Sequence, residues 1–314
     1  MTTDSLRAFF DLTGRTAIVT GGTRGIGLAI AEGLVECGAN VVVASRKADA
    51  CTAAADKLQA LGGGRAVGVP THLGDLDAIG RLVDTTAAAF DGIDMVVNSA
   101  ANALSLPLGE FTPEAWSKSF FVNLQGPVFL IQAALPYLRN SGHASILNVV
   151  SAGAFIYSPA TSMYSAAKAA MVSFTRSMAA AFAAEGIRVN ALAPGSVDTD
   201  MARVNSPEFI EVMKAAALLK RIADPIEMVP PRCCCFLTQA VSSRGRPSSP
   251  TAEWSPGRNG SHDRHTRRNA AMSGDAAITV ERSDDGAIAI RTIWPTPRVS
   301  RTPSRWPPPA RASP

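Results

Sequence analysis

Tyr164 and Lys168, four positions apart in the segment YSAAK, form the pattern in this chain that most directly suggests proton chemistry. A helix through this segment would place both side chains on one face. A nearby ammonium group favours the phenolate, so it would lower the tyrosine pKa from about 10 and let Tyr164 exchange a proton with an alcohol or ketone oxygen. Tyr-x-x-x-Lys is a common pattern. Its value here comes from Ser151, which ends the fifth predicted strand at the sheet edge where ligands bind.

A glycine-rich turn near the N-terminus suggests a second function, the binding of a dinucleotide. The segment TGGTRGIG covers residues 20–27, between a predicted strand and a predicted helix, and contains Gly21, Gly25 and Gly27. Glycine permits a tight turn here and lets a pyrophosphate approach the helix N-terminus, where free N–H groups and the helix dipole favour negative charge. A tight turn without a ligand is the alternative interpretation.

The end of the second predicted strand should select the cofactor. An acidic residue about 20 residues after the glycines would bind a ribose 2′-hydroxyl and favour NAD. The chain instead has Ser45 followed by Arg46 and Lys47, and Arg24 lies within the glycine turn. Cations without the acid suit a 2′-phosphate, so we expect NADP(H) to be preferred over NAD(H). The alternative is that Arg46 and Lys47 only begin a solvated helix.

Six short apolar runs, separated by longer helical patterns, must position these residues. The runs cover residues 15–20, 40–45, 65–70, 93–98, 144–150 and 187–193, and the helical patterns cover 24–37, 48–61, 75–90, 113–139 and 159–185. Strands that alternate with helices predict parallel βαβ units. The expected fold class is therefore α/β, a Rossmann-type doubly wound parallel sheet that forms a single domain over residues 1–229.

The order of the motifs resembles that of the short-chain dehydrogenase/reductase family, over roughly residues 10–228. TGGTRGIG is followed by NSAA (98–101), FVNLQG (121–126), Ser151, YSAAK and PGSVDT (194–199). The resemblance implies an oxidoreductase that interconverts an alcohol and a ketone or aldehyde by hydride transfer. Tyr164 would be the general acid/base, Lys168 would hold the nicotinamide ribose and lower the Tyr164 pKa, and Ser151 would bond the substrate oxygen.

The resemblance also implies further roles around the cofactor and the substrate. Asn123 would position a water in the proton relay, and the segment from Met201 onward would cover the substrate. The cofactor-binding residues that it implies are Gly21, Thr23, Arg24, Gly25, Ile26, Gly27, Ser45, Arg46, Asn98, Ala100, Tyr164, Lys168, Pro194, Gly195, Val197 and Thr199. Ala101 departs from the pattern, because the family has a glycine there that gives the cofactor room.

Composition divides the chain near residue 229. Up to Met228 there are 17 Lys and Arg against 20 Asp and Glu, a net charge of −3, and from Val229 onward 13 against 6, a net charge of +7. Twelve of the 21 prolines lie in this last part. The tail therefore has the composition of disordered sequence. We divide it into a Pro/Arg/Ser-rich part over 230–271 and a part over 272–314 with a hairpin over 278–293, whose turn would be Asp-Asp-Gly.

The tail lacks the ending that the family resemblance leads us to expect, namely a helix, an apolar edge strand and an Asp-Gly-Gly turn. Read one base earlier, the codons of Cys233, Cys234 and Cys235 become one NTG and two leucine triplets. Those of Pro-Thr-Ala-Glu-Trp (250–254) can then spell Asp-Gly-Gly-Met. We therefore interpret the chain as frameshifted near residues 229–231. A genuine but unusual tail is the alternative.

The remaining expectations concern location and partners. The sequence shows no signal-peptide pattern and no apolar run of about 20 residues, so we expect a cytoplasmic protein without membrane contact. The five cysteines indicate neither a disulfide framework nor a metal site. We expect a small carbonyl or alcohol substrate and no nucleic acid, and the family resemblance implies a dimer or tetramer that this C-terminus puts in doubt. The alternatives are a catalytically impaired dinucleotide-binding protein and an arginine-tail nucleic-acid binder.

Overall fold

Six strands rich in β-branched and small apolar residues form one parallel sheet, in the order β3-β2-β1-β4-β5-β6. The strands are β1 (Thr16–Thr20), β2 (Asn40–Ser45), β3 (Ala66–Pro70), β4 (Met95–Asn98), β5 (Ser145–Val149) and β6 (Arg188–Leu192). The computed structural model describes residues 10–156, 160–229, 277–282 and 288–293. This sheet confirms the predicted doubly wound α/β fold, with the strand order reversing between β1 and β4.

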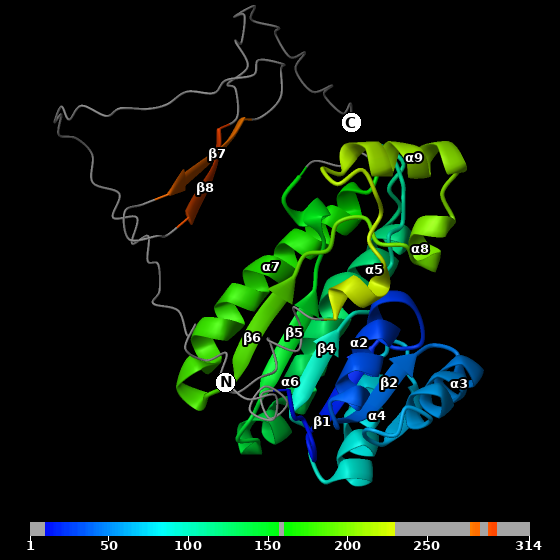
Figure 1. Cartoon of the computed structure of the whole chain (residues 1–314), viewed down its shortest axis with the longest axis vertical. Helices are drawn as coiled ribbons and strands as arrows, with labels where there is room; N and C mark the ends of the chain where they lie inside the picture. Colours follow the sequence, from blue (N-terminus) through cyan, green and yellow to red (C-terminus); the bar gives the residue numbers. More distant parts are fainter. Residues whose placement is uncertain (1–9, 157–159, 230–276, 283–287, 294–314) are drawn as a thin grey trace, which may run out of the picture. The chain divides into compact units, whose positions relative to one another are not determined.

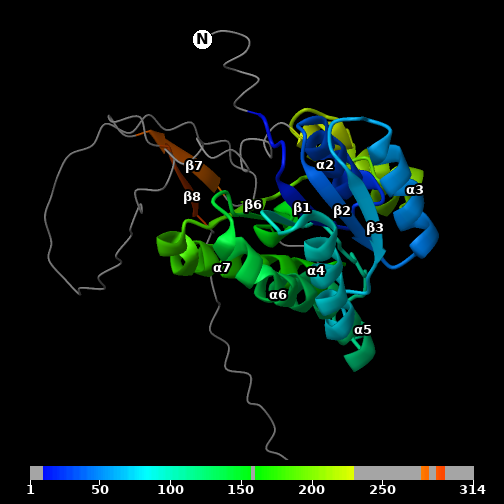
Figure 2. The same cartoon turned by 90° about the horizontal axis from the view of Figure 1, so that it is seen from below.

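Helices cover both faces of the sheet (Figures 1 and 2). They are α2 (Gly25–Glu36), α3 (Ala48–Gln59), α4 (Leu76–Phe90), α5 (Pro113–Phe120), α6 (Gly126–Asn140), α7 (Ser162–Phe182), α8 (Asp200–Arg203) and α9 (Pro207–Ala216). The short helices are η1 (Phe121–Gln125), η2 (Ala152–Ala154), η3 (Ala183–Glu185) and η4 (Pro225–Met228). The helical pattern predicted over 113–139 is one continuous run of α5, the π-helical turn η1 and α6.

Alternation along each strand divides the core into two layers. In β1, Ile18 packs with α4, α6 and α7 on one face, while Ala17 and Val19 pack with α2 and α3 on the other. In β2, Val42 and Val43 divide in the same way. Strands buried on both faces read as continuous apolar runs, which is why the sequence located them.

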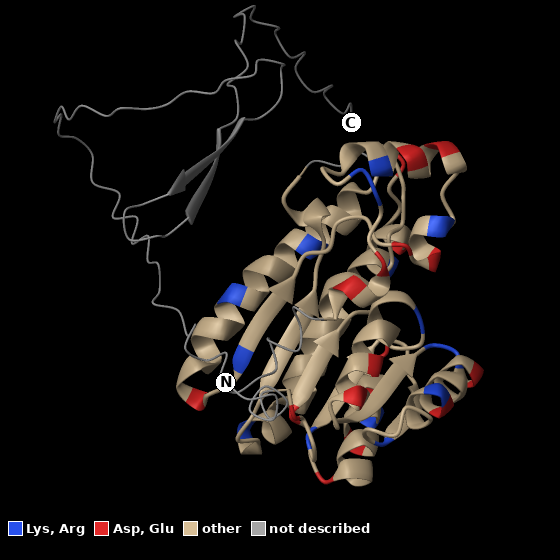
Figure 3. Cartoon of the chain, viewed as in Figure 1, with Lys and Arg blue, Asp and Glu red and all other residues tan. Residues whose placement is uncertain are grey.

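Charged residues lie on the helices and loops and are nearly absent from the sheet (Figure 3). Strands β1 to β5 contain no Lys, Arg, Asp or Glu, and β6 contains Arg188. Because the helices bury these strands, a charge there would have to be taken out of water at a high cost in free energy.

The segment Pro113–Asn140 has the length and the mean hydropathy, 1.2, of a membrane span. Its apolar side chains include Leu130, Ile131 and Leu138, which are fully buried in the core layer formed with α4 and α7. The apolar character of this segment is accounted for by packing against the sheet.

The chain divides into two units, Met1–Ser249 and Pro250–Pro314. In the second unit, β7 (Ala277–Arg282) pairs antiparallel with β8 (Ile288–Ile293), with Ala277 opposite Ile293. The predicted Asp-Asp-Gly turn of this hairpin lies outside the described residues, as do the segment 230–271 and the three consecutive cysteines.

Candidate active site

The residues singled out by sequence lie at the carboxyl ends of the strands. Because all six strands are parallel, these ends meet at one edge of the sheet, where ligands bind in folds of this class. Gly21 follows β1, Ser45 and Asn98 end β2 and β4, Ser151 follows β5, and Pro194 follows β6. The sheet therefore gathers segments that are far apart in sequence.

The glycine turn is packed too closely for side chains. A Cβ on Gly21 would lie 2.8 Å from the Cα of Ala100, and a Cβ on Gly27 would lie 2.2 Å from the carbonyl oxygen of Gly21. Both Gly21 and Gly25 have positive φ, 67° and 53°. The turn therefore requires glycine for backbone conformation at two positions and for close approach at Gly21 and Gly27.

The N-terminus of α2 is suited to an anion. Arg24 is the N-cap residue, its side chain makes no capping hydrogen bond, and the first turn contains no acidic residue. Uncapped N–H groups and the helix dipole favour a negative group at this position. The geometry of the turn thus fits the pyrophosphate of a dinucleotide.

Thr20 is a residue of this edge that sequence reasoning missed. Its hydroxyl donates to the carbonyl oxygen of Val97 at 3.3 Å and accepts from the N–H groups of Ser99 at 3.1 Å and Ala100 at 3.3 Å. It thereby joins the end of β1 to the loop after β4. Thr20 is the first residue of the TGGTRGIG motif, and this position could have identified it from the sequence.

Asn98 begins a buried chain of polar side chains. Its Nδ2 donates to Oδ1 of Asn148 at 2.9 Å, and Nδ2 of Asn148 donates to the Thr175 hydroxyl at 2.9 Å. The chain joins β4, β5 and α7. Oδ1 of Asn98 is buried without a hydrogen-bond partner among the described residues, so it remains an acceptor for another group.

The side chains of Ser151 and Tyr164 lie together at this edge of the sheet. Their side chains are hydrogen-bonded to each other, and Ser151 Oγ also accepts from the N–H of Gly153 at 3.1 Å. Burial raises the pKa of Tyr164, and the hydrogen bond from Ser151 opposes this rise. The expected lowering of this pKa is therefore wrong for the described structure, because desolvation of the phenolate outweighs the stabilising contacts.

Lys168 is buried and directed at the end of β5. Its Nζ donates to the carbonyl oxygen of Val149 at 2.8 Å and lies 5.7 Å from the centroid of the Tyr164 ring. Burial lowers the pKa of Lys168 to about 8. The lysine and the tyrosine share a face of α7, as their spacing predicted.

Asn123 lies in the π-helical turn η1, and its side chain makes several hydrogen bonds within the protein. Its Nδ2 donates to the carbonyl oxygens of Asn102 at 2.7 Å and Ser119 at 2.9 Å, and its Oδ1 accepts from the N–H of Asn102 at 3.1 Å. The side chain therefore fixes the loop after β4 against the helix.

The segment after β6 closes over the glycine turn. The N–H of Ala152 donates to the carbonyl oxygen of Pro194 at 2.9 Å, which joins this segment to the Ser151 loop. Cγ2 of Thr199 lies 3.1 Å from the position of a Cβ on Gly25. Val197 is buried and pairs with Ala223 in a parallel bridge, and a Cβ on Gly195 would meet nothing within 4 Å.

The candidate residues for the cofactor's ribose lie at the end of β2. Ser45 is half-buried and its hydroxyl lies 3.6 Å from Sγ of Cys51, whereas Arg46 and Lys47 are exposed. Within the described residues no carboxylate pairs with Arg46. Thr23 and Ile26 are half-buried in and after the turn, and Ile26 packs against the core. Among the described residues, no cluster of His, Cys, Asp or Glu could hold a metal ion.

A parallel six-stranded sheet, a glycine turn at an open helix N-terminus and a Ser–Tyr–Lys group at the same edge define a nucleotide-dependent oxidoreductase of the Rossmann class. Residues 15–208 match the family described as short chain dehydrogenase. The chain therefore belongs to this family and is an NAD(P)-dependent short-chain oxidoreductase that acts on an alcohol or a ketone.

Named relatives agree with this assignment. The chain is 37% identical over 218 residues to dehydrogenase/reductase SDR family member 4 of Pongo abelii, covering 68% of this chain and 78% of the relative. The Pseudomonas aeruginosa RhlG/NADP active-site complex superposes with a TM-score of 0.69 and 32% identity, over 74% of this chain and 93% of that one. A 3-oxoacyl-[acyl-carrier protein] reductase with bound NAD from Brucella melitensis superposes with a TM-score of 0.68 and 30% identity, over 76% and 90%.

Proposed function

We propose that the chain interconverts an alcohol and a ketone or aldehyde with NADP(H), using Tyr164 as the general acid/base. The observation that carries the proposal is the group formed by Ser151, Tyr164 and Lys168 at the ligand-binding edge of the sheet. When bound, the nicotinamide supplies or accepts the hydride. The protein's own residues hold the oxygen and move its proton.

Ser151 and Tyr164 are placed to share one substrate oxygen. Their side-chain hydrogen bond supports this, because it holds the two hydroxyl groups next to each other. Because burial keeps the pKa of Tyr164 high, the phenol stays protonated at neutral pH and can donate its proton to a carbonyl oxygen. The protonated phenol is the form of Tyr164 that carbonyl reduction requires.

Lys168 is the group proposed to bind the ribose hydroxyls of the nicotinamide. Its ammonium carries three donors, of which the structure assigns one to Val149. Because one N–H of the Lys168 ammonium already bonds the carbonyl oxygen of Val149, the ammonium is held in place. Its other two N–H groups would then be oriented toward the ribose without movement of the side chain. Asn123 is the residue proposed to position a water in the proton relay, and its Oδ1 keeps a second lone pair besides the bond from the N–H of Asn102.

The preference for NADP(H) is proposed from the end of β2. Ser45 and the exposed cations of Arg46 and Lys47 stand where an acidic residue would select NAD. The solved relatives include one with NADP and one with NAD. The proposed preference of this chain therefore rests on Ser45, Arg46 and Lys47 and not on family membership.

The substrate is proposed to be an apolar carbonyl compound. Helix α9 buries none of its residues in the chain, and its Phe209 and Val212 are 51% and 61% exposed. Phe155 and Ile156, which follow the Ser151 loop, are also exposed. These exposed side chains are therefore available to cover an apolar substrate, whereas Ile210 and Met213 of the same helix are half-buried.

The test is turnover of purified chain with NADPH or NADH and a panel of ketones and aldehydes, followed by absorbance of the reduced nicotinamide. The expected result is NADPH oxidation with apolar carbonyl compounds. Tight nucleotide binding without turnover of any carbonyl would contradict the proposal.

A second candidate function is nucleotide binding without catalysis. Within the described residues β6 is the last strand of the sheet, so it forms an edge strand. The dimer or tetramer implied by the family would then also be impaired. Light scattering on the purified chain distinguishes a defined oligomer from a monomer or aggregates.

A further inference from the structure

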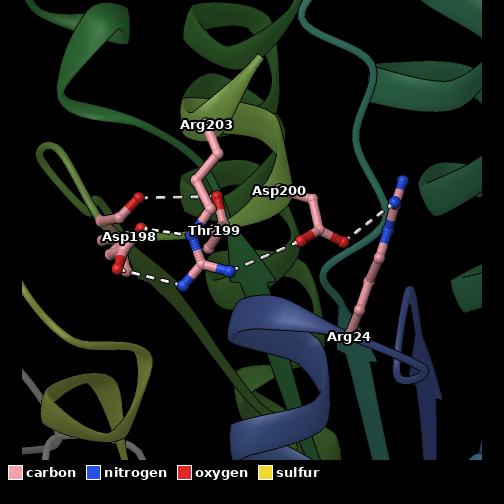
Figure 4. A network of polar contacts seen from close by, with 6 residues as sticks. Arg24, Asp198, Thr199, Asp200 and Arg203 are labelled. Atoms are coloured by element: carbon pink, nitrogen blue, oxygen red, sulfur yellow. Dashed lines mark hydrogen bonds and ion pairs between the residues drawn. The ribbon is translucent and has the colours of Figure 1, made fainter. Parts of the chain in front are cut away.

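Arg24 of the glycine turn forms an ion pair with Asp200, the first residue of α8. Nη1 of Arg24 lies 3.2 Å from Oδ2 of Asp200, although the two residues are 176 positions apart in sequence (Figure 4). The backbone brings them together, because Thr199 packs against Gly25. Its Cγ2 lies 3.1 Å from the position that a Cβ on Gly25 would occupy. The pair thus lies where the segment after β6 meets the turn that is suited to the cofactor's pyrophosphate.

Asp200 belongs to a small network of alternating charges. Its other oxygen lies 3.8 Å from Nη1 of Arg203, and Arg203 forms a two-point contact with Asp198 at 2.8 and 3.0 Å. The pair of Arg203 with Asp198 lowers the pKa of Asp198 and raises that of Arg203. Arg203 is therefore held mainly by Asp198, and Asp200 is left to act on Arg24.

The turn that carries Arg24 borders the end of β2. The N–H of Gly21 donates to the carbonyl oxygen of Ala44 at 2.8 Å, and Ser45 and Arg46 follow immediately. Arg24 and Arg46 therefore follow the ends of two adjacent strands, β1 and β2, in which Thr20 lies opposite Ala44. Arg24 could contribute its charge to a 2′-phosphate at the end of β2 only by exchanging Asp200 for the phosphate.

We propose that Asp200 is a positioning residue for cofactor selectivity, which acts through Arg24 by competing with the cofactor's 2′-phosphate. The inference rests on the proposed use of NADP(H). NADH has no 2′-phosphate, so its binding requires no exchange of partners at Arg24. Asp200 thus lowers the affinity for NADP(H) relative to NAD(H). Because Asp200 is the first residue of α8, the size of this effect depends on the position of that helix.

The experiment compares dissociation constants of NADPH and NADH, measured by titration calorimetry, for the wild-type chain, Asp200→Asn and Asp198→Asn. Asp198→Asn is the comparison variant, since it removes one charge from the same network at a residue that does not contact Arg24, although it frees Arg203 to turn to Asp200. We expect Asp200→Asn to raise the ratio of the NADH constant to the NADPH constant by about 2- to 5-fold, the size of an exposed ion pair. The ratio should rise less in Asp198→Asn than in Asp200→Asn.

A double variant isolates the role of Arg24. In an Arg24→Ala background, adding Asp200→Asn should no longer change the ratio. Equal tightening of both nucleotides in Asp200→Asn, or the same ratio as in Asp198→Asn, would overturn the inference and leave the proposed function intact. Failure of the wild-type chain to bind either nucleotide would overturn both.

Discussion

The ammonium group of Lys168 is fixed to the carbonyl oxygen of Val149, the last residue of β5, by a hydrogen bond of 2.8 Å. Ser151 follows two residues later on the same strand end, and Tyr164 precedes the lysine by one turn of α7. One hydrogen bond thus joins the helix that carries Tyr164, the proposed acid/base, to the strand end that precedes Ser151. The proposed catalytic group is therefore held by a helix and a strand of the fold, as precise positioning requires.

Replacing Tyr164 with Phe removes the proposed proton donor and little else. Turnover should fall by about 10²-fold or more, the usual contribution of general acid–base catalysis. NADPH affinity should remain close to that of the wild-type chain. Tyr137→Phe, on α6, is the matched control, and activity of Tyr164→Phe near the wild-type level would exclude the acid/base role.

The direction of the Tyr164 pKa shift predicts a pH dependence. Burial raises this pKa, so the protonated phenol needed for carbonyl reduction persists through neutral pH and is lost only at alkaline pH. We expect kcat/KM for reduction to be constant near neutrality and to fall at alkaline pH, while alcohol oxidation rises. A reduction rate that falls on passing from pH 6 to pH 7 would contradict this direction.

Lys168 should make stability depend on pH. Burial lowers its pKa from 10.5 to about 8, so between these values the unfolded chain binds more protons than the folded chain and stability rises with pH. Lys168→Met should flatten this rise in urea unfolding curves by up to about 1.4 kcal/mol per pH unit. Lys118→Met, at an exposed position of α5, should leave the slope unchanged. An equal slope in the wild-type chain and Lys168→Met would be the contrary result.

Arg46→Asp should shift cofactor preference toward NAD(H). The substitution removes a cation from the proposed 2′-phosphate site and places a carboxylate where it can accept from a ribose hydroxyl. The ratio of kcat/KM for NADPH to that for NADH should fall by about 10- to 100-fold, the size of one or two hydrogen bonds to a charged group. Lys57→Asp, near the other end of α3, makes the same charge change and should leave the ratio intact.

The interpretation of the C-terminal segment is tested at the gene. Sequencing across the codons for residues 229–231 should reveal a one-base change that restores the expected Asp-Gly-Gly ending. A single intact reading frame, together with a natural protein of 32.7 kDa, would show that the tail is genuine.

Local patterns in the sequence determined the strands, the helices and the places of the glycine turn and the YSAAK segment. They could do so because burial of a parallel sheet requires continuous apolar runs, and helical spacing fixes which side chains share a face. Ser151 and Tyr164 were proposed as catalytic residues from their positions and from the family resemblance, and the structure brings their side chains together.

Only the tertiary structure decided how these residues are tuned. The raised pKa of Tyr164 depends on burial, which its spacing from Lys168 does not encode. The closed set of bonds around Asn123 and the pair of Arg24 with Asp200 join segments distant in sequence. Desolvation and long-range contacts arise when the elements pack against one another, so the sequence located the chemical groups and the packed structure set their environment.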